Sequence, residues 1–283
     1  MKETGKISFI GYGVMAEAMI AGILRHGIAL PEQLIATGPR EERGLQLREL
    51  YKIHTSTDNV EAARVSDVVV LSVKPQRLDK VLAGLHGEIQ PDALVLSIVA
   101  GATTTAINNA LHHGPIVRAM PNTPAQIGEG ITVWTTSPEV TDEQQALAQK
   151  ILSALGEEVF VEEENYLDMA TAVSGTGPAY VFLFLEAMTD AGVHLGLPRR
   201  IAEKLVVQTL RGSVNYYDKV KAHPAALKNQ VTSPGGTSAA ALYYLEKAGF
   251  RTAISRAIWA AFERSQELGR GRQTKSPENH STE

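Results

Sequence analysis

The fold is decided by residues 7–16, which read ISFIGYGVMA. The first four residues have the apolar pattern of a short strand, and the G-x-G-x-x-A turn that follows leads into an apolar, alanine-rich helix over residues 17–25. In this context the glycines permit a tight turn and the close approach of a pyrophosphate, while the small third residue lets helix and strand pack closely. Residues 7–16 therefore predict a dinucleotide-binding unit at the start of the chain.

Composition limits the other functions of the chain. Its 283 residues are 44% hydrophobic, which is enough for two domains with a proper core. The net charge of -4 and the dispersed Lys and Arg residues argue against nucleic-acid binding. The absence of cysteine excludes disulfides, zinc–thiolate sites, iron–sulfur clusters and cysteine nucleophiles. Chemistry must then come from hydroxyls, backbone amides or a bound cofactor.

No targeting or membrane segment is expected. The first six residues lead straight into the strand pattern, without the hydrophobic core or cleavage site of a signal peptide. The most apolar helical run, residues 178–188, contains Glu186 and is shorter than the roughly 20 residues that span a bilayer. We expect a cytoplasmic protein without membrane contact.

The end of the second predicted strand, residues 34–37, bears on the choice of cofactor. An NAD-preferring site usually places an acidic residue there to bind the ribose 2′-hydroxyl. This chain instead reads TGPR over residues 37–40, and a hydroxyl and a guanidinium suit a 2′-phosphate. Because two glutamates follow, an ordinary solvated helix start is the other interpretation. The stretch favours NADPH, with NADH as the alternative.

Further strands complete a mostly parallel sheet. The β-branched runs at residues 68–73 and 94–99 are typical of strands buried on both faces. Ligands of open α/β sheets bind beyond the carboxyl ends of strands, so the turns after both runs should face the nicotinamide. In the first of these turns we interpret Lys74 as a positioning or surface residue. The remaining predicted elements are strands over residues 116–120, 130–134 and 158–161, a stiff turn at 121–124 and a helix over 141–155, and this domain spans residues 1–164.

From residue 165 onward the β-branched runs give way to helical periodicity. We predict an all-helical domain over residues 165–270 and a disordered, charged tail over 271–283. The predicted helices of the helical domain cover residues 167–173, 178 onward, 198–212, 224–229 and 250 to about 269. Residues 174–177 are predicted to break the helix between the first two. Residues 179–185 are apolar nearly all the way round, which predicts burial in a subunit interface and hence a homodimer.

The chemistry is expected in residues 231–242, which read VTSPGGTSAAAL. Four hydroxyl residues flank a tight Pro-Gly-Gly turn, Thr237 and Ser238 are good N-cap residues, and a strong helix former follows. The unpaired N–H groups of such a helix start can hold a carboxylate or phosphate. An ordinary capped helix is the alternative interpretation. The histidines form no metal-binding pattern, and no hydrolase motif is present.

The chain resembles the pyrroline-5-carboxylate reductase family over about residues 5–270. The resemblance rests on five motifs, which are FIGYGVMA at 9–16, SVKPQ at 72–76, RAMPNTP at 118–124, SGTGPAY at 174–180 and VTSPGGT at 231–237. The first is shared by many dehydrogenases, whereas the last two together are highly specific. The resemblance implies NAD(P)H-dependent reduction of a cyclic imine to L-proline, the last step of proline biosynthesis, by a Rossmann domain followed by a helical domain that interlocks two subunits, with a larger ring of dimers left open.

The resemblance also implies site residues. For the cofactor these are Gly11, Tyr12, Gly13, Val14, Met15 and Ala16 at the pyrophosphate, Thr37, Arg40 and Asn59 at the adenosine ribose, and Lys74, Pro75 and Ala100 at the nicotinamide, with Val73 and Asn122 as further contacts. For the substrate they are Ser233, Gly235, Gly236, Thr237 and Ser238, and Ser238 is the catalytic hydroxyl at the substrate nitrogen. Many bacterial relatives have a second threonine where this chain has Ser238. No metal is implied.

Two alternatives remain at this point. A reductase of the β-hydroxyacid dehydrogenase type, or another imine reductase, also joins a Rossmann domain to a helical one. The β-hydroxyacid type needs a proton donor, commonly a lysine, on the helix after the first domain, and residues 170–177 contain none. A non-catalytic NADP-binding sensor would bind the cofactor without ever oxidising it.

Overall fold

The computed structural model describes residues 5–273, with side chains over residues 5–269. These residues form two compact units, the first made of residues 5–176 and 261–273 and the second of residues 177–260. The division at Thr176 lies later in the chain than the boundary predicted at Glu164. The predicted tail begins within the last helix, which ends at Gln273, and its remainder, 274–283, lies outside the described residues.

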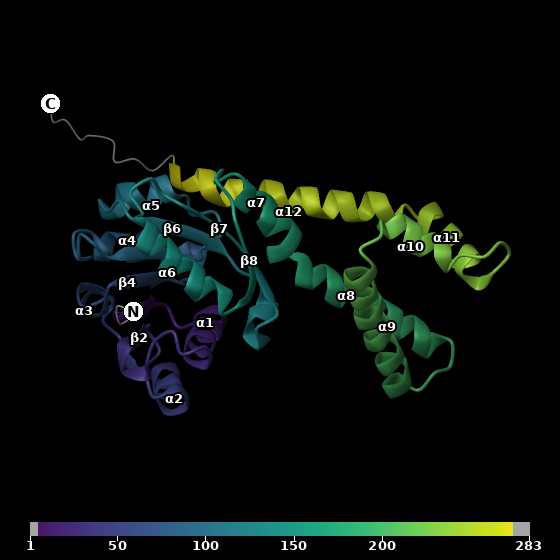
Figure 1. The fold of residues 1–283 in the computed structure, drawn as a ribbon, viewed down its shortest axis with the longest axis horizontal. Coiled ribbons are helices and arrows are strands. Elements are labelled where there is room, and N and C mark those ends of the chain that lie inside the picture. Colours follow the sequence, from purple (N-terminus) through teal and green to yellow (C-terminus); the bar gives the residue numbers. More distant parts are fainter. Residues whose placement is uncertain (1–4, 274–283) are drawn as a thin grey trace. The chain divides into compact units, whose positions relative to one another are not determined.

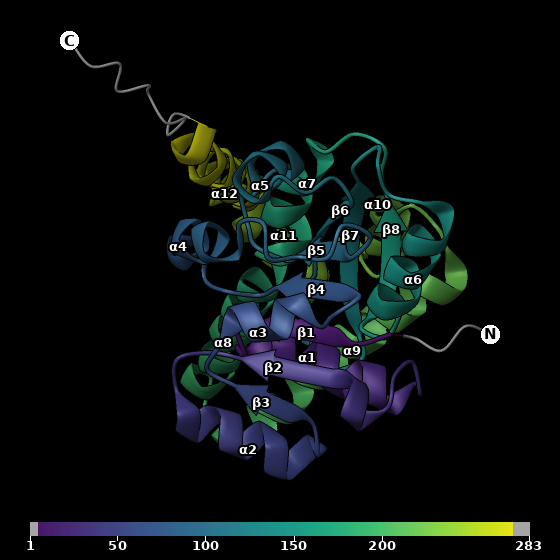
Figure 2. The same cartoon turned by 90° about the vertical axis from the view of Figure 1, so that its left-hand side faces the viewer.

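The first unit is built on an eight-stranded sheet in the order β3-β2-β1-β4-β5-β6-β7-β8. All neighbouring strands are parallel except β6 and β7, which confirms the mostly parallel sheet expected from the sequence. Figure 2 shows β3 lowest, followed upward by β2, β1, β4 and β5. The strands are β1 (Ile7–Ile10), β2 (Leu34–Thr37), β3 (His54–Ser56), β4 (Val68–Leu71), β5 (Leu94–Ser97), β6 (Ile116–Met120), β7 (Gly130–Thr136) and β8 (Gly156–Phe160).

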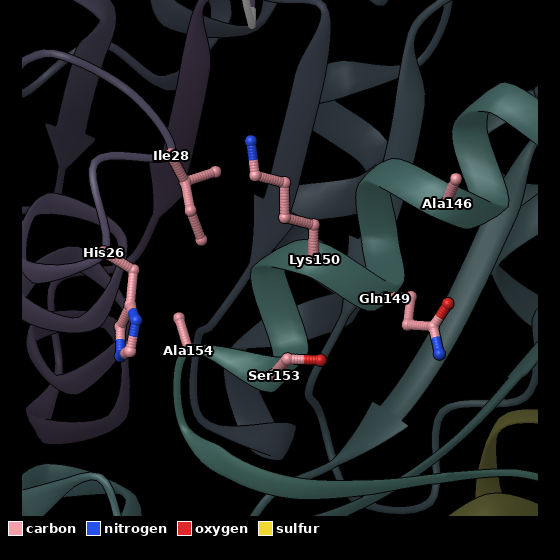
Figure 3. A pocket seen from close by; sticks show the side chains of 7 residues that line it. All are labelled: His26, Ile28, Ala146, Gln149, Lys150, Ser153 and Ala154. Atoms are coloured by element: carbon pink, nitrogen blue, oxygen red, sulfur yellow. The ribbon is translucent and has the colours of Figure 1, made fainter.

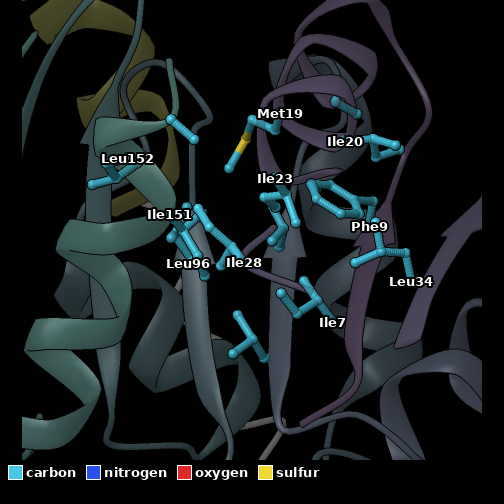
Figure 4. Close-up of a cluster of buried hydrophobic side chains, with 14 of the residues drawn as sticks. Ile7, Phe9, Met19, Ile20, Ile23, Ile28, Leu34, Leu96, Ile151 and Leu152 are labelled. Carbon is cyan, nitrogen blue, oxygen red and sulfur yellow. The ribbon is translucent and has the colours of Figure 1, made fainter. Parts of the chain in front are cut away.

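Helices cover both faces of this sheet (Figure 1). On one face, α1, α2 and α6 pack over the central strands, and Figure 4 shows α1 and α6 side chains meeting strand side chains such as Phe9 and Leu96. On the other face, α3, α4 and α5 bury a second apolar cluster. The helices of this unit are α1 (Val14–Arg25), η1 (Pro31–Gln33), α2 (Glu41–Tyr51), α3 (Asn59–Arg64), α4 (Pro75–Leu85), α5 (Thr104–Leu111), η2 (Thr123–Ile127), α6 (Asp142–Ser153), α7 (Tyr166–Ala170) and η3 (Thr171–Gly175).

Local sequence explains where several of these helices begin. At α6, the Thr141 hydroxyl accepts a hydrogen bond from Gln144 N (3.2 Å), and the Gln144 side chain accepts one from Thr141 N (3.0 Å). This reciprocal pair is a capping box, the arrangement that a T-x-x-Q sequence can form at a helix start. At α3, Asp58 accepts hydrogen bonds from the backbone N–H groups of Val60 and Glu61. Proline at the first position begins α4, where its missing N–H leaves nothing unsatisfied.

The junction between the units corrects one prediction. Residues 174–177 do not break the helix at once, because α7 continues as the π-helix η3, in which Thr176 N donates to Thr171 O at 2.8 Å. A Cβ at position 175 would lie 2.8 Å from Met120 Cε, so Gly175 permits the close packing of η3 on Met120. The helical stretch that begins at Tyr166 therefore runs to Gly175, and α8 begins at Gly177.

The second unit is all-helical, as predicted. It contains α8 (Gly177–His194), α9 (Arg199–Val220), α10 (Pro224–Gln230), α11 (Thr237–Lys247) and the first part of α12 (Phe250–Gln273). Helix α9 continues past Gly212, where the sequence prediction ended it, because a single glycine in an otherwise helical run costs only about 1 kcal/mol. Large apolar side chains are exposed on this unit, among them Phe182 (63%), Leu183 (66%) and Trp259 (63%). None of the helices among residues 5–273 has the length and apolar character needed to cross a membrane.

Candidate active site

The glycine-rich turn lies at the carboxyl end of β1, between β2 and β4. Gly11 N donates to Thr37 O at the end of β2 (3.0 Å), and the Ser72 hydroxyl after β4 donates to Gly11 O (2.6 Å). Strand order reverses at β1, since β2 lies on one side of it and β4 on the other. Dinucleotides bind at such switch points in open α/β sheets.

The two glycines of this turn have different surroundings. Gly11 has φ +102°, and a Cβ there would lie 2.8 Å from Val73 Cγ1 and 3.0 Å from the Ser72 backbone. Gly13 has φ −74° as the N-cap of α1, and a Cβ there would meet no atom within 4 Å. An open space thus adjoins the unpaired N–H groups of the α1 start. A dinucleotide pyrophosphate fits these features.

The other residues of the turn divide between contact and packing. Val14, in the first turn of α1, is 58% exposed and available to a ligand. Met15 packs against the core beneath α1, and Ala16 is fully buried, so their contribution to a cofactor site comes through the backbone. Tyr12 is 4% exposed, and its hydroxyl lies 2.6 Å from Gly38 O and 2.5 Å from Arg40 O. Burial raises the pKa of Tyr12 above its ordinary value.

The structure brings together the residues expected at the adenosine ribose. The buried Thr37 hydroxyl donates to Asn59 Oδ1 at 2.7 Å, which joins the end of β2 to the start of α3. Arg40 is exposed, and none of the ion pairs within residues 5–269 includes its guanidinium. Arg43, one turn along, is instead paired with Glu17 of α1, and the Tyr51 hydroxyl also donates to Glu17 (3.2 Å). The Arg40 guanidinium, unlike that of Arg43, is therefore available to an anionic group at the expected adenosine-ribose site.

The residues expected near the nicotinamide follow β4 and β5. Lys74 is the exposed N-cap of α4, followed by Pro75 at the first position of that helix, while Val73 is half-buried beside Gly11. Ala100 follows β5 and precedes Gly101, which has φ +69°. A Cβ on Gly101 would lie 2.9 Å from Gly269 N and Leu268 Cβ, so α12 packs closely on this turn. Only a glycine permits that approach.

Asn122, expected as a cofactor contact, is held by hydrogen bonds to backbone groups. Its side-chain oxygen accepts a hydrogen bond from Ile131 N (3.0 Å) and its amide nitrogen donates to Ser174 O (3.2 Å). It is 8% exposed. Its observed contacts thus stabilise the turn after β6 and tie it to η3.

A buried charge network was not predicted. Arg118 of β6 is paired with Glu164 (3.1 Å) and Asp168 (3.0 Å), and its side chain is 3% exposed. Glu164 accepts hydrogen bonds from the backbone and hydroxyl of Thr104, and Asp168 accepts one from Ser265 of α12 (2.8 Å). An arginine inside an apolar strand pattern was the available signal, because a buried charge requires partners. The network joins β6, α5, α7 and α12.

The stretch expected to bind substrate lies in the second unit. Its helix α11 begins at Thr237, and the N-cap is Gly236 without a side-chain cap. The prediction that Thr237 and Ser238 cap the helix is therefore wrong, because they are its first two helical residues. Gly235 has φ +71°, and a Cβ on Gly236 would lie 2.9 Å from Ser233 Oγ. The N–H groups of Thr237 and Ser238 have no intrahelical partner, and the Ser233 hydroxyl lies beside Gly236, the residue before them.

A hollow of about 420 Å³ lies at the other end of α1, as Figure 3 shows. It contains no predicted site residue. Its lining comes from the end of α1 and from α6, and consists of His26, Ile28, Ala146, Gln149, Lys150, Ser153 and Ala154. No group of three metal-binding side chains occurs in the described part of the chain.

Comparison with known proteins shows the family to which this chain belongs. The pyrroline-5-carboxylate reductase dimerisation model matches residues 164–268, and the NADP oxidoreductase, coenzyme F420-dependent, model matches residues 6–101. A pyrroline-5-carboxylate reductase of Synechocystis sp. is 47% identical over 94% of this chain and 98% of its own length. This chain belongs to the pyrroline-5-carboxylate reductase family. The family resemblance inferred from the motifs is thereby confirmed.

Other members of the pyrroline-5-carboxylate reductase family agree with this assignment. The Escherichia coli enzyme is 38% identical over 94% of this chain and 98% of its own length. The crystal structure of the Plasmodium falciparum reductase with NADP bound aligns with a TM-score of 0.87 at 34% identity, covering 94% of this chain and 99% of the other. Membership favours the imine reductase over the β-hydroxyacid dehydrogenase and sensor alternatives. The match to a dimerisation model supports the expected homo-oligomer.

Proposed function

We propose that this chain reduces 1-pyrroline-5-carboxylate to L-proline with NADPH, the last step of proline biosynthesis. The observation that carries the proposal is the identity to named reductases over almost the whole chain, in a structure that retains both the open glycine turn and the helix start at Gly236. NADH is the alternative cofactor. When bound, the reduced nicotinamide supplies the hydride.

For the cofactor, we assign the pyrophosphate to the turn from Gly11 to Ala16. Its support is the open space at Gly13 beside the N-terminus of α1. We assign the adenosine ribose to Thr37 and Asn59, the 2′-phosphate to Arg40, and the nicotinamide to the turns at Val73, Lys74, Pro75 and Ala100. Asn122 holds the neighbouring turn in place through Ile131 and Ser174.

For the substrate, we assign the carboxylate to the N–H groups of Thr237 and Ser238, with Ser233 beside them and with Gly235 and Gly236 shaping the turn. The positive end of the α11 dipole favours an anion there. The Ser238 hydroxyl is assigned to the ring nitrogen. Hydride adds to the carbon of the protonated imine, the C=N π bond breaks, and its electron pair becomes the nitrogen lone pair of a secondary amine.

These assignments match the demands of the reaction. A protonated imine is already electrophilic, and hydride addition to it builds no oxyanion. The site must therefore orient the ring, anchor its carboxylate and hydrogen-bond its nitrogen, without a strong acid or base. The absence of a catalytic histidine or lysine from the proposed substrate site agrees with this.

We further propose a homodimer formed through the helices of the second unit, with a ring of dimers as the larger assembly to be tested. Support comes from α8, where Val181, Phe182 and Leu183 are all more than half exposed in the single chain. Covering such side chains would remove apolar surface from water at about 25 cal/mol per Å².

The proposed function is tested by following the near-ultraviolet absorbance of NADPH with purified protein and 1-pyrroline-5-carboxylate. Imine-dependent oxidation is the expected result. NADH, the six-membered cyclic imine and a 2-keto acid serve as comparisons. Turnover of the keto acid alone would establish a β-hydroxyacid dehydrogenase type, and cofactor binding without any turnover would establish a sensor.

Ser238→Ala should lower kcat by about 100-fold and leave NADPH affinity unchanged, because it removes a hydrogen bond to the reacting nitrogen only. The measurement is steady-state kinetics combined with an NADPH binding titration. The matched control is Thr232→Val, since the Thr232 hydroxyl already donates to Lys228 O at 2.7 Å and is not free for substrate. Unchanged turnover in Ser238→Ala would remove this residue from the mechanism.

Arg40→Ala should raise KM for NADPH about tenfold, the worth of one charge-assisted hydrogen bond of about 1.5 kcal/mol, and leave KM for NADH nearly unchanged. The control is Arg48→Ala, which removes another exposed cation from α2. An equal rise for both cofactors would show that Arg40 does not contact the 2′-phosphate.

A further inference from the structure

Tyr12 connects the glycine-rich turn after β1 to the loop between β2 and α2, which lies more than 20 residues further along the chain. It stands between the two glycines of the first turn, and its hydroxyl lies within hydrogen-bond distance of two carbonyl oxygens of the β2–α2 loop, Gly38 O (2.6 Å) and Arg40 O (2.5 Å). Its one proton is shared between or alternates over these acceptors. The side chain is almost fully buried. The hydroxyl therefore holds a fixed position against the β2–α2 loop and is not a solvated surface group.

The ring of Tyr12 requires its neighbour to be glycine. A Cβ on Gly38 would lie 2.6 Å from two atoms of the Tyr12 ring. At Gly44, in the first turns of α2, a Cβ would lie 3.8 Å from the same ring, which is ordinary contact. The ring thus rests directly on the Gly38 backbone, and the hydroxyl extends beyond it to Arg40.

This contact fixes the backbone position from which the Arg40 side chain extends. Arg40 is the N-cap of α2, and its carbonyl also accepts hydrogen bonds from Arg43 N (3.0 Å) and Gly44 N (3.3 Å). Pro39 restricts φ between the two carbonyls that Tyr12 contacts. The Arg40 peptide is thereby held from α2 on one side and from the glycine turn on the other, while its guanidinium stays exposed.

We propose that Tyr12 is a specificity-determining positioning residue, whose hydroxyl holds the Gly38–Arg40 turn so that Arg40 meets the 2′-phosphate of NADPH. The inference rests on the proposed function, because that function requires NADPH. The positioning of Arg40 by Tyr12 can nevertheless be tested by ligand binding, without turnover. Because burial raises the pKa of Tyr12, the hydroxyl remains a donor throughout the neutral pH range.

The test is Tyr12→Phe, which keeps the ring on Gly38 and removes the hydroxyl. Calorimetric titration should show the Kd of adenosine 2′,5′-bisphosphate rising about tenfold and that of 5′-AMP changing less than about twofold. The Kd of NADPH and NADH should follow the same pattern. Tyr51→Phe is the matched control, since it removes another hydroxyl of the same region, bonded to Glu17 instead of the turn.

A double-mutant cycle distinguishes positioning from general damage. In an Arg40→Ala background, Tyr12→Phe should add little further loss for the bisphosphate, because the group it positions is gone. Equal weakening of 5′-AMP and the bisphosphate, additive losses in the double variant, or no change in Tyr12→Phe would each overturn the inference. If the parent protein binds the bisphosphate selectively but never oxidises NADPH with an imine, the proposed function fails while the role of Tyr12 is still decided by these titrations.

Discussion

Replacing Gly13 with alanine should weaken NADPH binding by about 100-fold, because overpacking a close contact costs about 1–3 kcal/mol and each 1.4 kcal/mol is about tenfold in Kd. The added Cβ projects into space where no protein atom lies within 4 Å, beside the start of α1. In the proposed complex the pyrophosphate needs that space for close contact with the backbone. The free energy of unfolding should change little. Alanine accepts φ −74°, and the weaker N-cap is offset by the lower entropy of the unfolded chain.

The comparison for this variant is Gly11→Ala. At Gly11, φ is +102° and a Cβ would lie 2.8 Å from Val73 Cγ1 and 3.0 Å from backbone atoms of Ser72. Backbone strain and overpacking together should lower the free energy of unfolding by about 3 kcal/mol. Urea unfolding and NADPH titration of both variants give the result. If Gly13→Ala bound NADPH as the parent does, the pyrophosphate would not lie against this turn.

Replacing Arg118 with methionine should lower the free energy of unfolding by about 3 kcal/mol, at the low end of the cost of removing one partner from a buried ion pair. The variant leaves the Glu164 and Asp168 carboxylates without their cation. These side chains retain 28% and 18% exposure, so water relieves part of the penalty. Since Asp168 also accepts the Ser265 hydroxyl, the last turns of α12 should become less protected from hydrogen exchange.

The control is Arg199→Met in the second unit. Its ion pair with Asp190 measures 2.7 Å, shorter than either contact of Arg118, but the two side chains are 59% and 56% exposed. Water screens an exposed ion pair, and ordering its two long side chains costs entropy, so such a pair contributes little to stability. Urea unfolding midpoints of the two variants should therefore differ clearly. Equal midpoints would mean that burial does not determine how much the Arg118 network contributes to the free energy of unfolding.

Much of the fold follows from local patterns. The runs at residues 68–71 and 94–96 are apolar at every position, which only a strand covered on both faces requires, and both belong to central strands of the sheet. The capping box at Thr141 likewise depends on neighbours in sequence. The edge strand β3 was missed, because three residues, HTS, carry no apolar periodicity and pair only with β2.

The candidate site was predictable where its residues are contiguous. The turn at Gly11–Ala16 and the hydroxyl-rich turn at Ser233–Ser238 are both recognisable as motifs. The identity of the N-cap of α11 was not, since serine and threonine are preferred caps and the chain instead uses Gly236, leaving Thr237 inside the helix. Only the backbone path through Gly235 decides which residue stands at that position.

The sequence by itself determined the dinucleotide-binding unit, the parallel strands and the helical second half, because these depend on residue periodicity and on glycines a few positions apart. The tertiary structure alone decided that Tyr12 contacts Arg40 and that Arg118 joins Glu164 to Asp168. Those partners lie 28, 46 and 50 residues apart in the chain. A hydrogen bond or ion pair acts over a few ångströms of space, and only packing of the strands and helices brings such distant residues within that range.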